Sequence, residues 1–279
     1  MTIKIVTDST SDLPPELAKE QDISVVPIYL RFGQEVYRDM IDIDQDEFYQ
    51  KLTHGPVHPS TTQPSPKDFS NVYKELGKKA DGILSIHISS KLSGTYNAAL
   101  RGKEDADPKC PVEVIDSEVG TMGLGLLVLA ANKLAKASKN LQQLVQEVKQ
   151  MIPNIHVMGL LDTLKYLQLG GRLGKMQALL GSILSIKPLL ILKDGVLSPA
   201  GRVRSRAKGI DSLVEYVKNA KEIHDLSVIY NTTLDEAKAL VKRLGGVFDE
   251  AQIKLARLGP GLGVHAGPGL LMVALIGKR

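Results

Sequence analysis

The feature that most constrains the fold is a recurring order of strand, polar turn and helix in the first half of the chain. Residues 82–86 form a short apolar run with the length of a buried parallel strand, a hydroxyl-rich turn follows, and Tyr96 and Ala99 then fall at helical spacing. Residues 3–6 start the chain in the same way and lead, through a second hydroxyl-rich segment, to a short helix opened by Pro14. This order is typical of a parallel sheet with crossover helices.

Four apolar runs alternate with helical patterns up to about residue 150, and we interpret them as the strands of one sheet. They lie at 3–6, 23–28, 82–86 and 112–115, with a hairpin at 29–38 and helices at 44–52, from 67, from 95, at 121–137 and at 141–151. Helices on both faces of this sheet would give a parallel α/β/α layer, which we assign to a first domain of residues 1–152.

The pattern changes after Pro153. Lys193 to Val196 is a strong hairpin signal, because Asp-Gly supplies the two turn residues between apolar runs. The second sheet is therefore expected to be mixed, with strands at 155–161, 187–193, 196–202, 226–230, 252–257 and 271–276 and helices at 163–169, 175–184, 204–219 and 234–244. The predicted fold class is α/β with two domains, the second being a two-layer, mixed-sheet α/β domain of residues 153–279.

Composition excludes several classes of function. The net charge of +4 is small beside 35 basic and 31 acidic side chains, and no Lys/Arg block is present, so we expect no nucleic-acid partner. The single cysteine, Cys110, excludes an internal disulfide and a cysteine zinc cluster, and suits a reducing cytosol. Residues 1–10 lack the apolar core of a secretion signal, and no apolar run reaches the ~20 residues of a membrane span. A cytoplasmic protein without integral membrane association is expected.

Familiar catalytic motifs fail on inspection. Residues 123–125 read Gly-Leu-Gly but lack the third small residue of a dinucleotide turn, so a core helix is favoured. Residues 170–175 are one residue short of a phosphate loop, and Met176 stands where a magnesium-binding hydroxyl is needed. Residues 205–208 match Ser-x-x-Lys without its companion motifs, and no histidines have metal-ligand spacing. We therefore predict no catalytic residue, no metal and no cofactor.

Two hydroxyl-rich stretches could instead bind an anion. The Pro-rich loop 55–66 is stiff and holds Thr61 and Thr62 in fixed places. Ser93 is predicted to cap the helix that follows it, which leaves the amides of Gly94 and its neighbour facing any bound anion. The alternative is a capped helix with no ligand.

Two glycine-rich loops add a cation and an imidazole. Arg172 follows two glycines, and it could equally cap a helix or lie on the surface. His265 lies in a glycine-rich loop, residues 259–269, that would let the backbone approach a ligand, although a plain turn into the last strand is also possible. Together with the hydroxyls, these groups are the donors that would hold a carboxylate.

The sequence resembles the DegV family over its full length. Five motifs occur in the family's order: TDSTSD at 7–12, TTQPSP at 61–66, SSKLSGT at 89–95, GGRL at 170–173 and GVHAGPG at 263–269. The resemblance implies a bacterial protein of two α/β domains that buries a long-chain fatty acid and presents its carboxylate to a separate fatty acid kinase, which makes the acyl phosphate. Carried over by motif, the carboxylate-binding set is Thr61, Thr62, Ser93, Gly94, Arg172 and His265. Thr62 stands where the family often has Ser.

The expected function is thus that of a lipid-binding subunit rather than an enzyme, with bound fatty acid in place of a cofactor. A small-molecule kinase or phosphotransferase on a related plan is the alternative, but its phosphate-loop or metal-carboxylate features are missing. Candidates for the acyl-tail cavity are Leu160, Leu164, Leu167, Leu180, Ile183, Leu184 and Ile186.

A basic corner is expected where the hairpin passes into a helix, at Arg202, Arg204, Arg206 and Lys208. The resemblance favours Arg202 as a contact for the kinase, and a solvated helix start is the alternative.

Overall fold

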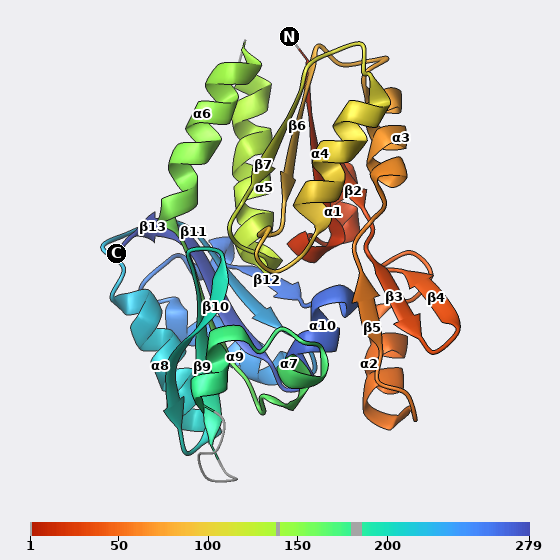
Figure 1. Cartoon of the computed structure of the whole chain (residues 1–279). Coiled ribbons are helices and arrows are strands. Elements are labelled where there is room, and N and C mark those ends of the chain that lie inside the picture. Colours follow the sequence, from red (N-terminus) through yellow and green to blue (C-terminus); the bar gives the residue numbers. More distant parts are fainter. Residues whose placement is uncertain (1, 138–139, 180–185) are drawn as a thin grey trace.

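The computed structural model describes residues 2–137, 140–179 and 186–279. The first half of the chain forms a parallel sheet with the strand order β2-β1-β6-β7 (Figure 1). Its strands are β1 (Ile3–Asp8), β2 (Ile23–Val26), β6 (Gly82–His87) and β7 (Val112–Asp116). All neighbouring pairs run parallel, as the strand and helix order predicted.

Helices cover both faces of this parallel sheet, because side chains alternate between the faces along each strand. Val6 and Ile83 pack on α3 (Pro66–Leu76) and α4 (Thr95–Ala106). Ile5 and Leu84 pack on the other side, where the helices are α1 (Pro15–Glu20), α5 (Thr121–Ala137) and α6 (Leu141–Met151). The predicted α/β/α layer is confirmed.

The second sheet has the order β10-β9-β8-β13-β11-β12 and is mixed, as predicted. Its strands are β8 (Ile155–Leu160), β9 (Lys187–Lys193), β10 (Val196–Val203), β11 (Glu222–Tyr230), β12 (Lys254–Arg257) and β13 (Leu271–Lys278). Only β11 and β12 pair in parallel. Asp194 and Gly195 form the β9–β10 turn with φ of 52° and 77°, as the Asp-Gly signal indicated.

One hydrophobic core joins the two sheets. On one face of the mixed sheet lie α8 (Arg206–Lys218) and α9 (Leu234–Leu244), and on the other lies α5, which also packs on the parallel sheet. The start of α5 is buried all round, and a Cβ on Gly123 would lie 2.7 Å from Val157 Cγ2. The core-helix interpretation of this Gly-Leu-Gly stretch is confirmed. The domain boundary at residue 152 stays a prediction, since this core crosses it.

A third, small sheet was only partly predicted. The hairpin of β3 (Tyr29–Phe32) and β4 (Glu35–Arg38) is present, but β5 (Ser60–Thr62) also pairs with β3 in antiparallel register. This strand lies within the predicted Pro-rich loop, between Pro59 and Pro64, whose extended bias suits a short edge strand. The hydrophobic side of this sheet packs on α2 (Gln45–His54) and on α10 (Pro260–Ala266).

Several element boundaries differ from the prediction. The glycine-rich segment expected as a loop contains α10, and α8 starts at Arg206 because Ser205 caps it through Lys208 N. The helix expected at 175–184 is a short 3₁₀ helix, Gly174–Leu179, and its remaining residues lie outside the described ones. After β8, α7 (Lys165–Leu169) begins two residues later than predicted.

Candidate functional site

A narrow cavity of about 110 Å³ lies between the two halves of the chain, and its walls are mainly aliphatic. Residues from the turn after β6, from β9 and β13 and from the segments flanking α10 meet there. Apolar side chains that line it include Ile88, Leu161, Leu167, Leu190, Leu258 and Met272. This composition matches that of pockets for apolar ligands, in which a few polar groups fix the orientation.

The predicted tail residues are only partly confirmed by this lining. Leu167 lines the cavity, whereas Leu160 faces away from it and packs on Gly209 of α8, because alternate side chains of β8 point to opposite faces. Leu164 and Ile186 are not among the lining residues. The other three candidates, Leu180, Ile183 and Leu184, lie outside the described residues.

Thr61 and His265 form the polar end of the cavity. They are 204 positions apart in the chain, yet Thr61 Oγ1 lies 3.0 Å from His265 Nε2. Burial, with smaller effects from Arg172 and His58, lowers the pKa of His265 to about 4, so the imidazole is neutral at pH 7. Its Nδ1 is buried without a hydrogen bond and faces Gly170, where an added Cβ would lie only 2.1 Å away.

Ser93 and Arg172 line the same cavity. The prediction that Ser93 caps α4 is wrong: Gly94 is the N-cap residue and no side chain caps this helix. The amides of Leu92 and Ser93 both bond to Ser89 O, so the turn closes there and the helix starts two residues later. Ser93 Oγ lies 2.8 Å from Thr95 Oγ1 and is half-buried, which leaves it accessible to a ligand.

The remaining candidates lie outside the cavity lining. Thr62 is exposed, since neighbouring side chains on β5 point to opposite faces, and its role stays a prediction. Gly94 lines a separate outer pocket next to Ser93. The Arg172 guanidinium is exposed and donates from Nη1 to Gly170 O at 2.8 Å.

A fully buried chain of hydrogen bonds supports the turn that carries Ser93. Tyr73 donates to Ser85 Oγ at 2.8 Å, Ser85 Oγ lies 2.7 Å from His87 Nε2, and His87 Nδ1 lies 2.9 Å from Asp8 Oδ2. Asp8 Oδ2 also accepts from Ile88 N at 3.2 Å. The end of β6 and the turn after it are thereby fixed to β1. No local pattern in the sequence indicated this arrangement, because its members come from three separate elements.

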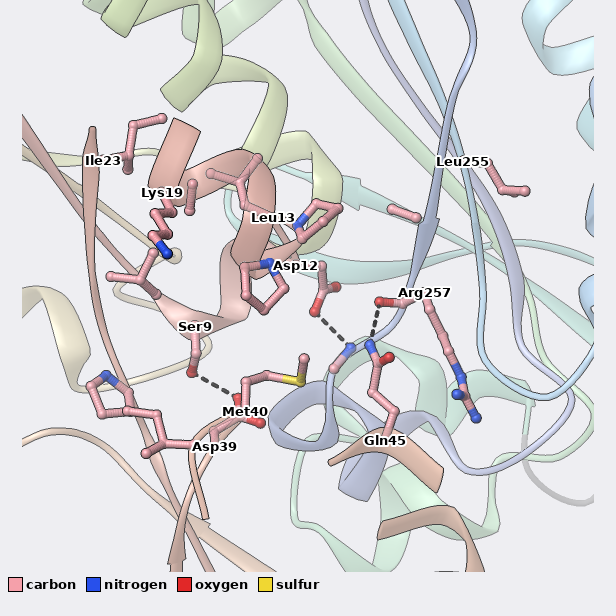
Figure 2. A pocket seen from close by; sticks show the side chains of 18 residues that line it. Ser9, Asp12, Leu13, Lys19, Ile23, Asp39, Met40, Gln45, Leu255 and Arg257 are labelled. Carbon is pink, nitrogen blue, oxygen red and sulfur yellow. Dashed lines mark hydrogen bonds between the residues drawn. The ribbon is translucent and has the colours of Figure 1, made fainter. Parts of the chain in front are cut away.

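A second pocket, of about 460 Å³, lies on the other side of the segment after β1 (Figure 2). Asp12 accepts from Gly259 N at 2.8 Å, and Asp39 accepts from Ser9 Oγ at 2.7 Å (Figure 2). Burial raises the pKa of Asp12 to about 8 and that of Asp39 to about 6. Because Gly259 is the N-cap residue of α10, Asp12 fixes the start of the helix that carries His265.

Two cavity-lining hydroxyls were not among the predicted site residues. Thr10 belongs to the hydroxyl-rich segment after β1, which was noted, and its hydroxyl donates to Asp8. Thr121 is buried with φ of 48°, and its Oγ1 has no hydrogen-bond partner. Nothing in the sequence around Thr121 indicated this.

Within the described ranges, no group of three His, Cys, Asp or Glu side chains could hold a metal ion. No helix in that part of the chain has the length and apolarity needed to cross a bilayer.

Comparison with known proteins agrees with the geometry of the fold. A family model described as "Uncharacterised protein, DegV family" matches residues 2–278. The chain belongs to the DegV family. A DegV domain-containing protein of Deinococcus radiodurans is 35% identical, with 99% of this chain and 98% of the relative covered. The DegV protein of Bacillus subtilis is 31% identical, with 97% of this chain and 98% of the relative covered.

Solved DegV structures have the same fold. A Thermus thermophilus DegV family protein, described by its fatty acid binding, is 34% identical with a TM-score of 0.91, and the match covers 99% of this chain and all of the other. Bacillus subtilis DegV, described as a fatty acid binding protein, is 30% identical with a TM-score of 0.89 and full coverage of both chains. A Streptococcus pneumoniae fatty acid kinase B3 protein loaded with linoleic acid shares the fold at 22% identity, with a TM-score of 0.87 over both whole chains.

Proposed function

We propose that this DegV protein binds a long-chain fatty acid, with the tail in the aliphatic cavity and the carboxylate at Thr61, Ser93, Arg172 and His265. The observation that carries the proposal is the placement of these four polar side chains around one end of an otherwise apolar cavity. The fatty acids bound by the Thermus thermophilus and Bacillus subtilis relatives support it.

The Thr61–His265 pair suits a carboxylate because its protons can be ordered in one direction. A neutral imidazole that carries its proton on Nε2 donates to Thr61 Oγ1, and the threonine proton is then left for the ligand. A carboxylate only accepts hydrogen bonds, so it matches this arrangement. Arg172 supplies the positive charge at the same end of the cavity.

Affinity and position would come from different parts of the ligand. Burying ~15 methylenes at ~0.8 kcal/mol each gives on the order of 12 kcal/mol before costs, against ~1.5–3 kcal/mol for each hydrogen bond to the charged head. The cavity of about 110 Å³ is smaller than the ~300 Å³ at the low end of ligand pockets, so the tail has to displace lining side chains. Met272, an unbranched side chain in the wall, is suited to such adjustment.

We further propose that the protein is a cytoplasmic carrier that presents the carboxylate to a separate fatty acid kinase and is not itself catalytic. Arg202 is exposed on β10 and is the proposed kinase contact. The expected basic corner is smaller than predicted, because Arg206 forms ion pairs with Asp162 and Glu236.

Mass spectrometry of the freshly purified, denatured protein tests the binding function, and a bound long-chain fatty acid is the expected result. Palmitate titration by displacement of a fluorescent fatty acid then tests the site. Thr61→Val and Ser93→Ala should each bind roughly tenfold or more weakly, since each loses a hydrogen bond to a charged group. Thr62→Val is the matched control and should bind like the wild type, because Thr62 is exposed and does not line the cavity.

Two results would contradict these proposals. Equal palmitate affinities for Thr61→Val, Ser93→Ala and the wild type would place the head group elsewhere, and failure of the wild type to bind any long-chain fatty acid would end the binding proposal. Incubation of the protein alone with ATP, magnesium and palmitate separates a carrier from a kinase. Acyl phosphate formed without a partner would show catalysis by this chain.

A further inference from the structure

An outer pocket of about 510 Å³ opens next to the polar end of the aliphatic cavity. The two spaces share four lining residues, namely Leu92, Ser93, Arg172 and Leu197. A ligand whose carboxyl group lies at Ser93 and Arg172 would therefore extend any further substituent on that carboxyl into the outer pocket.

The outer pocket is positively charged. Its lining includes Lys91, Arg172 and Lys175 and contains no carboxylate. In the described part of the chain, none of these three cations forms an ion pair with Asp or Glu. Lys91 Nζ donates to Asp194 O at 2.7 Å, which fixes the ammonium group and leaves two of its protons for a ligand.

A helix terminus adds to this positive potential. Gly94, the N-cap residue of the 12-residue helix α4, lines the same pocket. The amides in the first turn of an α-helix have no partner within the helix, and the helix dipole favours an anion in front of them. The glycines at 171 and 174 bring no side chain into the space.

The charge of the pocket exceeds what a fatty acid needs. A carboxylate carries one negative charge, and Arg172 with the hydroxyls of Thr61 and Ser93 already suits it. Two further lysines and a helix N-terminus fit a doubly charged phosphoryl group attached to that carboxyl. We propose that the outer pocket is a phosphoryl-binding subsite, so that this protein holds an acyl phosphate as well as a fatty acid; this rests on the proposed fatty acid site.

The test compares two ligands with the same tail. Hexadecyl phosphate is used because it resists hydrolysis, and palmitate is the reference, both titrated at constant ionic strength by displacement of a fluorescent fatty acid. Lys175→Gln and Lys91→Gln should each weaken hexadecyl phosphate about tenfold, the effect of losing one charge-assisted hydrogen bond, and palmitate less than about threefold. Lys218→Gln, which removes the same charge at the exposed end of α8, should change neither affinity.

Lys175→Gln keeps the test decisive, because Lys175 is exposed and forms no ion pair in the described structure, whereas Lys91 also contacts the β9–β10 turn. Thermal unfolding of each variant confirms that the fold is kept. If Lys175→Gln and Lys91→Gln leave hexadecyl phosphate binding unchanged, or weaken both lipids equally, the subsite is wrong while the fatty acid site stands. If the wild type binds neither lipid, the proposed function fails as well.

Inorganic phosphate distinguishes a lipid cargo from a free anion. At 10 mM, replacing chloride at equal ionic strength, it should leave palmitate affinity unchanged and reduce hexadecyl phosphate affinity less than twofold. Strong competition against hexadecyl phosphate would mean that the pocket binds free phosphate, and the acyl phosphate assignment would be overturned.

Discussion

Substitution of Gly170 by Ala should disable the head-group site without unfolding the protein. Gly170 ends α7 with φ of −79° and ψ of −2°, a conformation that alanine adopts easily. Its added Cβ, however, would lie 2.1 Å from His265 Nδ1, whereas ordinary contact begins near 3.4 Å. The imidazole must therefore move by about 1.3 Å, the difference between these two distances.

A shift of that size cannot preserve the 3.0 Å contact between His265 Nε2 and Thr61 Oγ1. The ring either retreats past bonding distance or collides with Thr61, and in both cases the threonine proton is no longer directed at the ligand. Loss of one hydrogen bond to a charged group costs ~1.5–3 kcal/mol, so palmitate affinity should fall roughly 10- to 150-fold.

The assay is palmitate titration of four proteins: the wild type, Gly170→Ala, Thr61→Val and the double variant. Because both substitutions remove the same interaction, the double variant should bind little worse than Thr61→Val alone. Gly246→Ala is the matched control, since a Cβ at Gly246 would meet nothing within 4 Å. Wild-type affinity in Gly170→Ala, or losses that add fully in the double variant, would refute the role given to the Thr61–His265 pair.

Three other perturbations test the surroundings of the site. Burial raises the pKa of Asp12 from its ordinary 3.8 to about 8, so its protonated form stabilises the fold at low pH and that contribution is lost as pH rises towards 8. Asp12→Asn, which can keep the bond to Gly259 N, should flatten the fall in melting temperature between pH 6 and pH 8; an unchanged slope would remove Asp12 as its cause. His87→Phe deprives Asp8 and Ser85 of buried partners and should lower the free energy of unfolding by about 2–6 kcal/mol, at ~1–3 for each group, in urea denaturation. Arg202→Glu should reduce acyl phosphate formation in a coupled assay with a fatty acid kinase while palmitate affinity stays at the wild-type value; full activity would exclude Arg202 as a contact.

Local patterns in the sequence were sufficient for much of the fold. The parallel strands follow from short apolar runs between helical patterns, and the β9–β10 hairpin follows from Asp194-Gly195, because both signals depend on a few neighbouring residues. Thr61, Ser93, Arg172 and His265 were recognised individually by their polar, glycine-rich or proline-rich surroundings. The structure places all four around one cavity.

The features that sequence reasoning missed depend on distant partners. Glycines in α10 were interpreted as a flexible loop, but a Cβ on Gly261 would lie 2.4 Å from Ile28 and one on Gly263 would lie 2.6 Å from Phe48. These glycines allow close helix packing, which overrides their low helix propensity. The pairing of β5 with β3 and the hydrogen bonds of His87 likewise join segments that are far apart in the chain.

The position of α5 limits how this protein can be divided or recombined. The helix is encoded before residue 152 but forms a wall for both sheets, so a fragment ending there would expose its apolar surface, and the remaining fragment would lack cover on one face of its sheet. A hybrid of two DegV proteins joined at that point would bring together a helix and a sheet that were not selected as partners. Exchange of segments is better tolerated if α5 and the strands β8 and β13 that it contacts come from the same parent.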